Sequence, residues 1–182
     1  MTILLSYNEI QSVARKAGSG AGLPYGVAEA VGHAAVWLSA RGIDAVSTVV
    51  AALADGAAIL DGLAAIDALS AGETRRVALS DDAAGLLLLG LAGAAMQGEI
   101  AFGLDRGQGG VVPLAGLRDI SLSLPAVLCR VREGGSAAAT PRPAACDAAA
   151  YAAALALAAK TYVPASELSR TLGAGAGTTD ND

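Results

Sequence analysis

The sequence predicts an α+β fold in a single domain that spans residues 1–182. Apolar residues recur at helical spacing over 1–70, which predicts an N-terminal helical bundle. Apolar and polar residues alternate within 73–132, as in strands, so we expect a central mixed or antiparallel sheet there. A linker rich in Gly, Ser, Pro and Ala, 133–145, separates this sheet from 146–182, where we expect a C-terminal helix and an ordered, Gly-rich tail.

The first seventy residues predict four helices joined by short connections. Ser6 and Glu9 form a capping box at the start of the first helix. Pro24 suits the first turn of the second helix, and Arg41 followed by Gly42 is a stop signal for its end. The remaining signals are the glycines at 18, 20 and 22, a cap at Asp44, the Asp55-Gly56 stop and a weaker fourth helix that ends at Leu69.

The middle of the chain predicts strands. Residues 75–79 suit a strand, and 80–82 suit either a helix start or a turn. Period alone does not assign the leucines at 86–89; we expect a strand there, followed by a short helix rich in Gly and Ala. Alternation predicts further strands over 99–105, over 117–124 and, after Pro125, around Val127, Cys129 and Val131.

Asp147 is expected to cap the last long helix. In that helix Tyr151, Leu155, Ala158 and Tyr162 share one face.

Composition excludes several classes of protein. The net charge is −5, aromatic residues make up 3% of the chain, and no dense basic cluster is present, so we expect no nucleic-acid binding. Mean hydropathy is +0.52, but the longest apolar run, 83–97, is shorter than the roughly 20 residues that span a bilayer. The N-terminus lacks the features of a signal peptide, so we expect a cytoplasmic protein with no membrane segment.

The motifs of common enzyme classes are absent from the sequence. With one histidine the chain has no HExxH zinc site, and neither lysine belongs to a Walker loop. No Gly-x-Gly-x-x-Gly opens a helix after a strand, and no Gly-x-Ser-x-Gly is present. Cys129 and Cys146 stand alone, and we expect both to be reduced, buried thiols. The sequence identifies no cofactor.

The second predicted helix carries a candidate for proton transfer. Glu29, His33 and Trp37 follow one another at intervals of four residues, away from the main apolar stripe. A carboxylate one turn before an imidazole can orient it and raise its pKa. The alternative is a surface ion pair beside a half-buried tryptophan.

The ends of the chain carry candidate ligand-binding groups. On the first helix Asn8 is free to bind a ligand, whereas Glu9 is already used by the capping box. Near the C-terminus two hydroxyls and a guanidinium share one face of a short helix, which suits a carboxylate or phosphate; the alternative is an ordinary capped helix. The residues of this face are Ser166, Ser169 and Arg170, and Tyr25 and Tyr162 are further candidates for binding the ligand.

The Gly-rich tail is a candidate for close backbone approach to a ligand. Gly173 and Gly175 permit positive φ. Asp180 and Asp182 then supply oxygen ligands of the kind that Mg²⁺ or Ca²⁺ prefers. The alternative is a frayed terminus that binds no metal.

Short motifs at both ends of the chain resemble a known family. They are SYNEI at 6–10, KA at 16–17, GAGLPYG at 20–26, AE at 28–29, WLSARG at 37–42, and TYVPASE, SR, GAGAG and DND between 161 and 182. With these motifs the chain resembles a bacterial family catalogued as domain of unknown function 3726. The resemblance implies a small cytoplasmic protein and supplies no catalytic residues.

A weaker likeness covers residues 8–55, which are similar to the N-terminal segment of the malate/L-lactate dehydrogenases that lack a Rossmann fold. The Ser-His-Gly motif of that family should follow Asp44, but the chain reads Ala45-Val-Ser-Thr there. The likeness therefore extends at most to the fold.

Three hypotheses about function follow from the sequence. The first is binding of a small anionic metabolite by a protein that we expect to form a homo-oligomer, in a pocket between the first two helices and the C-terminal segment, with His33 as a candidate proton carrier. The second is a non-catalytic structural or accessory subunit of a homo- or hetero-oligomer. The third is a degenerate relative of the dehydrogenases. The sequence does not decide whether the protein is an enzyme.

Overall fold

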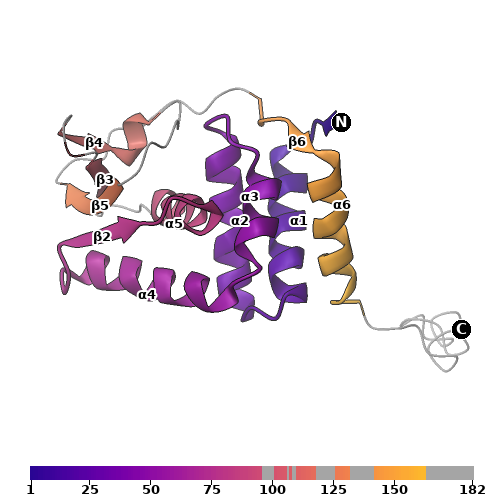
Figure 1. Ribbon diagram of the computed structural model, residues 1–182, viewed down its shortest axis with the longest axis horizontal. Helices are drawn as coiled ribbons and strands as arrows, with labels where there is room; N and C mark the ends of the chain where they lie inside the picture. The colour runs from indigo at the N-terminus through magenta and orange to yellow at the C-terminus, as the bar shows by residue number, and fades with distance from the viewer. Residues whose placement is uncertain (96–100, 106, 108–109, 118–125, 132–141, 163–182) are drawn as a thin grey trace, which may run out of the picture.

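The computed structural model describes residues 1–95, 101–105, 107, 110–117, 126–131 and 142–162, and it confirms the α+β fold class (Figure 1). The helices are α1 (Tyr7–Gly20), α2 (Tyr25–Ser39), α3 (Ala45–Ala52), α4 (Gly56–Ala71), α5 (Ala83–Ala94) and α6 (Ala148–Ala159). The strands are β1 (Thr2–Ile3), β2 (Arg76–Leu79), β3 (Ala101–Asp105), β4 (Val111–Pro113), β5 (Ala126–Val131) and β6 (Cys146–Asp147), and one turn of 3-10 helix covers Leu114–Gly116.

The helix starts follow the predicted capping chemistry. The capping box is confirmed: the backbone N–H and the hydroxyl of Ser6 both donate to Glu9 Oε2, at 2.7 and 2.8 Å. Asp44 and Asp147 cap α3 and α6, because the carboxylate of each accepts from backbone N–H groups in the first helical turn. The same chemistry starts α4 at Asp55 and α5 at Asp82.

The strand expected at residues 86–89 is wrong, because these leucines lie in α5. Helix α5 packs against α2, α3, α4 and β2, so nearly every face of it is buried and its sequence shows no apolar stripe. Its glycines permit the approach of α2. A Cβ at Gly93 would lie 2.1 Å from Trp37 Cε2, and one at Gly90 would lie 2.8 Å from Leu38 Cγ.

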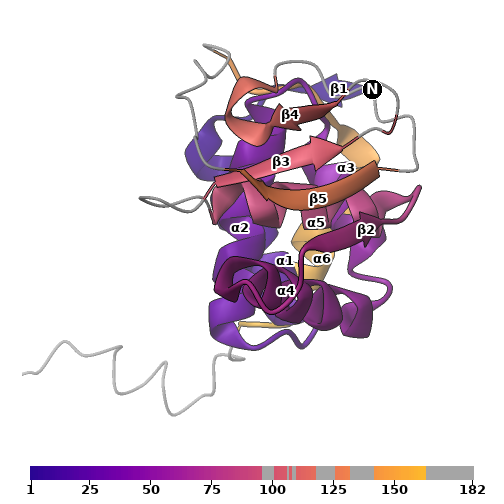
Figure 2. The same cartoon turned by 90° about the vertical axis from the view of Figure 1, so that its left-hand side faces the viewer.

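The main sheet has the strand order β2-β5-β3-β4, and every pair in it is antiparallel (Figure 2). This decides between the mixed and antiparallel alternatives. The strands predicted at 75–79, within 99–105 and around Cys129 are confirmed as β2, β3 and β5, whereas most of the strand expected at 117–124 lies outside the described residues. The three residues of β4 were missed. The sheet turns Val77, Leu79, Phe102, Leu104 and Leu128 toward the helices.

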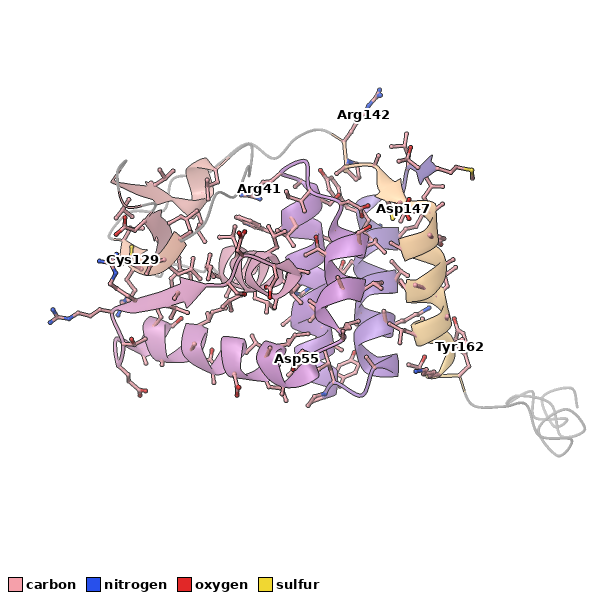
Figure 3. All side chains as sticks on the ribbon, viewed as in Figure 1. Arg41, Asp55, Cys129, Arg142, Asp147 and Tyr162 are labelled. Carbon is pink, nitrogen blue, oxygen red and sulfur yellow. The ribbon has the colours of Figure 1, made fainter. Side chains whose placement is uncertain are left out.

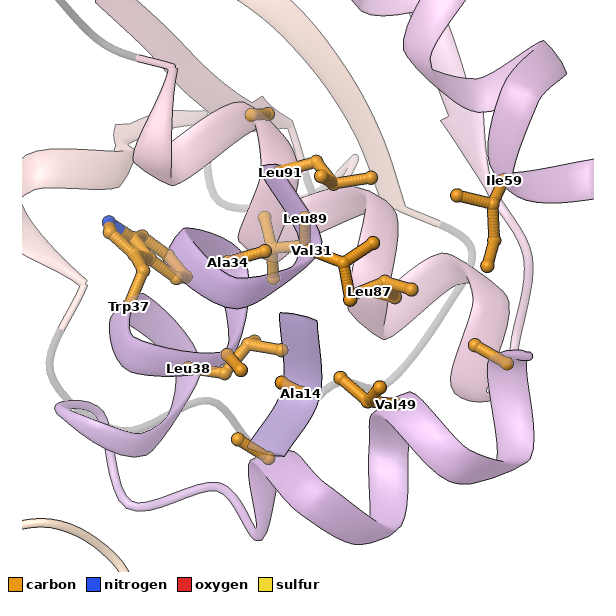
Figure 4. Close-up of a cluster of buried hydrophobic side chains, with 14 of the residues drawn as sticks. Ala14, Val31, Ala34, Trp37, Leu38, Val49, Ile59, Leu87, Leu89 and Leu91 are labelled. Carbon is orange, nitrogen blue, oxygen red and sulfur yellow. The ribbon is translucent and has the colours of Figure 1, made fainter. Parts of the chain in front are cut away.

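The core lies where α2 and α5 cross, with side chains from α1, α3 and α4 around them (Figure 4). On one side α5 separates the helices from the sheet, and on the other α6 packs along α1 (Figure 1). Within the described part of the chain no single helix is long and apolar enough to cross a membrane, although α3 and α4, bent by 107°, pass that test as a pair.

Candidate functional site

A groove lies between α1 and α6, on the side of the molecule away from the main sheet. Its volume is about 180 Å³. The lining residues from α1 are Glu9, Ser12, Val13 and Lys16, and those from α6 and the residues just after it are Tyr151, Leu155, Ala158 and Tyr162. Figure 3 shows Asp147 at the start of α6 and Tyr162 just beyond its end. The groove therefore joins the first helix of the chain to its C-terminal part.

Backbone contacts hold α1 and α6 side by side at both ends. At the start, β1 pairs with β6, so Thr2 lies opposite Asp147, and Ala148 N–H donates to Met1 O at 2.9 Å. The two helices therefore leave the same small sheet and run in the same direction. At their far ends a Cβ on Gly20 would lie 1.8 Å from Leu157 O, so only glycine permits this closeness.

A second backbone contact fixes the start of α6 in the bundle. Asp44 Oδ2 accepts from Asp147 N–H at 2.8 Å, while Asp44 Oδ1 accepts from Ser47 N–H at 3.0 Å. One carboxylate thus caps α3 and anchors the residue that caps α6. The position of the groove therefore follows from contacts that do not involve its lining side chains.

Among the described lining residues, Lys16 is the one cation. The hydroxyls of Ser12, Tyr151 and Tyr162 are the other polar groups apart from Glu9. The Glu9 carboxylate is already engaged, because the backbone N–H and then the hydroxyl of Ser6 hold its pKa below the usual range. An incoming ligand therefore meets an ammonium and hydroxyls above an apolar floor.

The structure places one of the sequence-predicted ligand-binding residues, Tyr162, in this groove. Asn8 is exposed on α1, one turn before Ser12, and does not line it. Tyr25 is 66% exposed at the start of α2, where the Arg15 guanidinium lies 6.0 Å from its ring centroid. The other candidates lie outside the described residues: Ser166, Ser169, Arg170, Gly173 and Gly175.

The predicted proton-transfer residues lie elsewhere. His33 is exposed and lines a separate hollow of about 150 Å³ between α2, α4 and α5, whose other lining groups are apolar. In the part of the chain that the structure describes, no hydrogen bond or ion pair joins His33 to Glu29. Trp37 is buried at 9% exposure rather than half-buried, because its ring packs on Gly93. The spacing of these three residues therefore does not bring them to the groove.

Metal ligands and reactive thiols do not gather in the described residues. No three His, Cys, Asp or Glu side chains come together there, and the candidates Asp180 and Asp182 lie outside those residues. Both cysteines are free; Cys146 is buried as expected, whereas Cys129 is half-buried. Burial, with the nearby Asp44 charge, raises the pKa of Cys146 to about 11, so its thiol is protonated at neutral pH.

The sequence indicated each wall of the groove separately but did not indicate that the two walls meet. Tyr151, Leu155, Ala158 and Tyr162 were predicted to share one face of a helix, and that face is the α6 wall. On α1, Lys16 follows Ser12 by four residues and therefore lies on the same side of the helix. Ser12 was missed, because nothing in a single hydroxyl on a helix distinguishes it from a solvated residue.

Comparison with known proteins gives one match. A family model described as "Protein of unknown function (DUF3726)" matches residues 5–84, which run from just after β1 into the start of α5, and this match supports the predicted family over that segment. No curated protein and no solved structure matches the chain. The likeness to malate/L-lactate dehydrogenases gains no support from these comparisons. The matched segment contains the α1 wall of the groove but not the α6 wall.

Proposed function

Because residues 5–84 match the model of the DUF3726 family, whose description assigns no function, we propose from the groove itself that the chain binds a small anionic metabolite between α1 and α6. The observation that carries the proposal is that one groove is lined by Lys16 and three hydroxyl-bearing residues together with apolar side chains. An ammonium attracts a carboxylate or phosphate as a compact point charge, and hydroxyls can then donate to its oxygens.

The size and floor of the groove support a small ligand with an apolar part. Val13, Leu155 and Ala158 provide the apolar surface, and Leu155 is 46% exposed without a ligand. Pockets for drug-sized ligands have volumes of about 300–1,000 Å³, whereas an apolar cavity of about 150 Å³ holds benzene. The groove, at about 180 Å³, therefore suits a monocyclic or short-chain acid better than a nucleotide.

The chain offers a direct test, because Lys16 and Lys160 are its only lysines. Reductive methylation with ¹³C-formaldehyde keeps both charges and gives each lysine its own NMR signal. We expect benzoate and hexanoate to shift the Lys16 signal saturably while the exposed Lys160 signal stays in place. Acetate lacks the apolar part and should bind more weakly, and neutral benzamide should bind more weakly because it lacks the charge.

Two variants make the test specific. Lys16→Gln should weaken benzoate binding at least tenfold, and the matched change Lys160→Gln should leave it unchanged, because Lys160 does not line the groove. Equal shifts of both lysine signals would mean that the added salt screens both charges, and they would refute binding of the acid in the groove. Binding that survives Lys16→Gln would refute the role of its ammonium.

The competing hypothesis of a non-catalytic subunit predicts a continuous apolar surface that another chain covers. The exposed large apolar side chains instead lie on different elements of the described structure; they are Met1, Leu4, Tyr25, Leu60, Val111, Leu155 and Tyr162. Two of them line the groove. Size-exclusion chromatography with light scattering distinguishes the hypotheses, because the subunit hypothesis requires a stable oligomer whether or not an acid is present.

A further inference from the structure

Arg41 lies over the ring of Trp37 at the C-terminal end of α2. The guanidinium carbon is 3.6 Å from the centroid of the indole ring, and Arg41 Nη1–H donates to Trp37 O at 3.0 Å. Both residues are 9% exposed, although arginine is rarely buried without a partner. The stack and the helix end each stabilise the guanidinium in part.

Two N–H groups in this stack have no acceptor in the part of the chain that the structure describes. Arg41 Nε and Trp37 Nε1 are both buried, and neither forms a hydrogen bond. Each is a donor that cannot accept, so the two cannot satisfy each other. A buried donor without an acceptor destabilises the folded state, and two of them in residues that contact each other call for a common explanation.

Among the described residues no carboxylate forms an ion pair with Arg41. The ion pair in that part of the chain joins Arg76 to Asp105 in the main sheet. Burial lowers the pKa of Arg41, and the nearby Tyr7 opposes that shift, yet a guanidinium remains protonated at neutral pH. The end of α2 offsets part of this charge, but its carbonyl at Trp37 is already used by Nη1.

The orientation of the ring turns the indole N–H of Trp37 away from the buried leucines. Figure 4 shows the indole nitrogen of Trp37 at the end of the ring that points away from the cluster of buried leucines. Gly93 packs beside this nitrogen: a Cβ there would lie 2.1 Å from Trp37 Cε2, the carbon bonded to Nε1, and 2.5 Å from Cζ2, so only glycine leaves the ring in this position. Because the guanidinium carbon lies 3.6 Å from the centroid of the indole ring, Arg41 Nε, which is bonded to that carbon, lies close to the same ring.

We propose that Arg41 and Trp37 form an anion-binding site at the end of α2, in which one oxyanion accepts from Arg41 Nε–H and Trp37 Nε1–H. The ligand carries carboxylate or phosphate oxygens, because these are the acceptors that pair with a guanidinium edge through two oxygens. The site is separate from the α1–α6 groove, and it stands whether or not the groove binds an acid.

Trp37 is the only tryptophan in the chain, so its indole N–H gives one NMR signal that needs no further assignment. The signal of Arg41 Nε–H is identified by its loss in Arg41→Lys. The protein is titrated with inorganic phosphate and, separately, with acetate, at constant ionic strength set with chloride. We expect saturable shifts of both signals with at least one of the two anions. Phosphate alone would identify a phosphate ligand, and both anions would identify a general oxyanion site.

Arg41→Lys keeps the positive charge but removes the planar fork, so we expect anion affinity at Trp37 to fall at least tenfold in this variant. Lys16→Gln should leave both shifts unchanged, which separates this site from the groove. The proposal is overturned if neither anion shifts the wild-type Trp37 signal saturably, or if Arg41→Lys binds with wild-type affinity. The wild-type titration decides the question even if Arg41→Lys does not fold.

Discussion

The contact between Gly20 and Leu157 makes a sharp prediction about stability. In Gly20→Ala the new Cβ would lie 1.8 Å from Leu157 O and 2.6 Å from its carbonyl carbon, so the backbones of α1 and α6 must separate. Inserting a methyl group into a packed contact costs about 1–3 kcal/mol. Replacing a helical glycine by alanine returns at most about 1 kcal/mol, and less at the last residue of a helix.

A net loss of about 1–2 kcal/mol in a chain of this length corresponds to a fall in Tm of roughly 2–8 °C. The measurement is thermal unfolding followed by circular dichroism. Gly26→Ala is the matched control: Gly26 lies in the first turn of α2, and no heavy atom lies within 4 Å of the position that a Cβ would take there, so Tm should stay or rise. A Gly20→Ala protein as stable as Gly26→Ala would show that α1 and α6 do not pack as described.

Two predictions concern titratable groups. Asp44→Asn should lower the pKa of Cys146 from about 11, since the Asp44 charge adds to the larger effect of burial; the pH dependence of alkylation by iodoacetamide measures it, and an unchanged profile would contradict the contact. The pKa of the Asp147 carboxylate is lowered chiefly by a hydrogen bond from the Ala150 backbone N–H, and that of Asp82 chiefly by a hydrogen bond from the Ser80 hydroxyl. Carboxylates depressed in the folded state stabilise it above their unfolded pKa of about 4, and this contribution is lost as pH falls through the folded value. The urea concentration at the unfolding midpoint should therefore decrease as the pH is lowered below about 4. The decrease should be smaller when both capping residues are changed to Asn, because Asn caps a helix without titrating.

The elements that the sequence predicted well are those whose signals are local. The start of α1 was predictable because Ser6 and Glu9 are three residues apart and satisfy each other. Helix α5 was not, because a helix buried on all sides loses the periodicity that distinguishes it from a buried strand. Strands β1, β4 and β6 have only two or three residues each, too few for any pattern, and Thr2 finds its partner Asp147 at the other end of the chain.

The groove shows the same division between local and distant information. The face that carries Tyr151 and Tyr162 was visible in the sequence, since it depends on helical spacing within α6. Its meeting with Lys16 depends on the β1–β6 pairing and on the space left at Gly20, neither of which has a local signature. The prediction that the N-terminal helices and the C-terminal segment form a pocket could therefore identify the region of the groove but not most of its lining residues.

The Arg41–Trp37 stack depends on a third segment, and this dependence gives a further prediction. Trp37 and Arg41 are four residues apart in the sequence, but from the sequence Arg41 was interpreted only as a signal for the end of a helix. Their burial requires Gly93 of α5, since a Cβ there would lie 2.1 Å from Trp37 Cε2. Gly93→Ala should therefore displace the ring, shift the emission of this single tryptophan to longer wavelength and weaken anion binding at Arg41 without any change to either binding residue. Unaltered emission and affinity in Gly93→Ala would mean that α5 does not position the ring and that the stack does not depend on this contact.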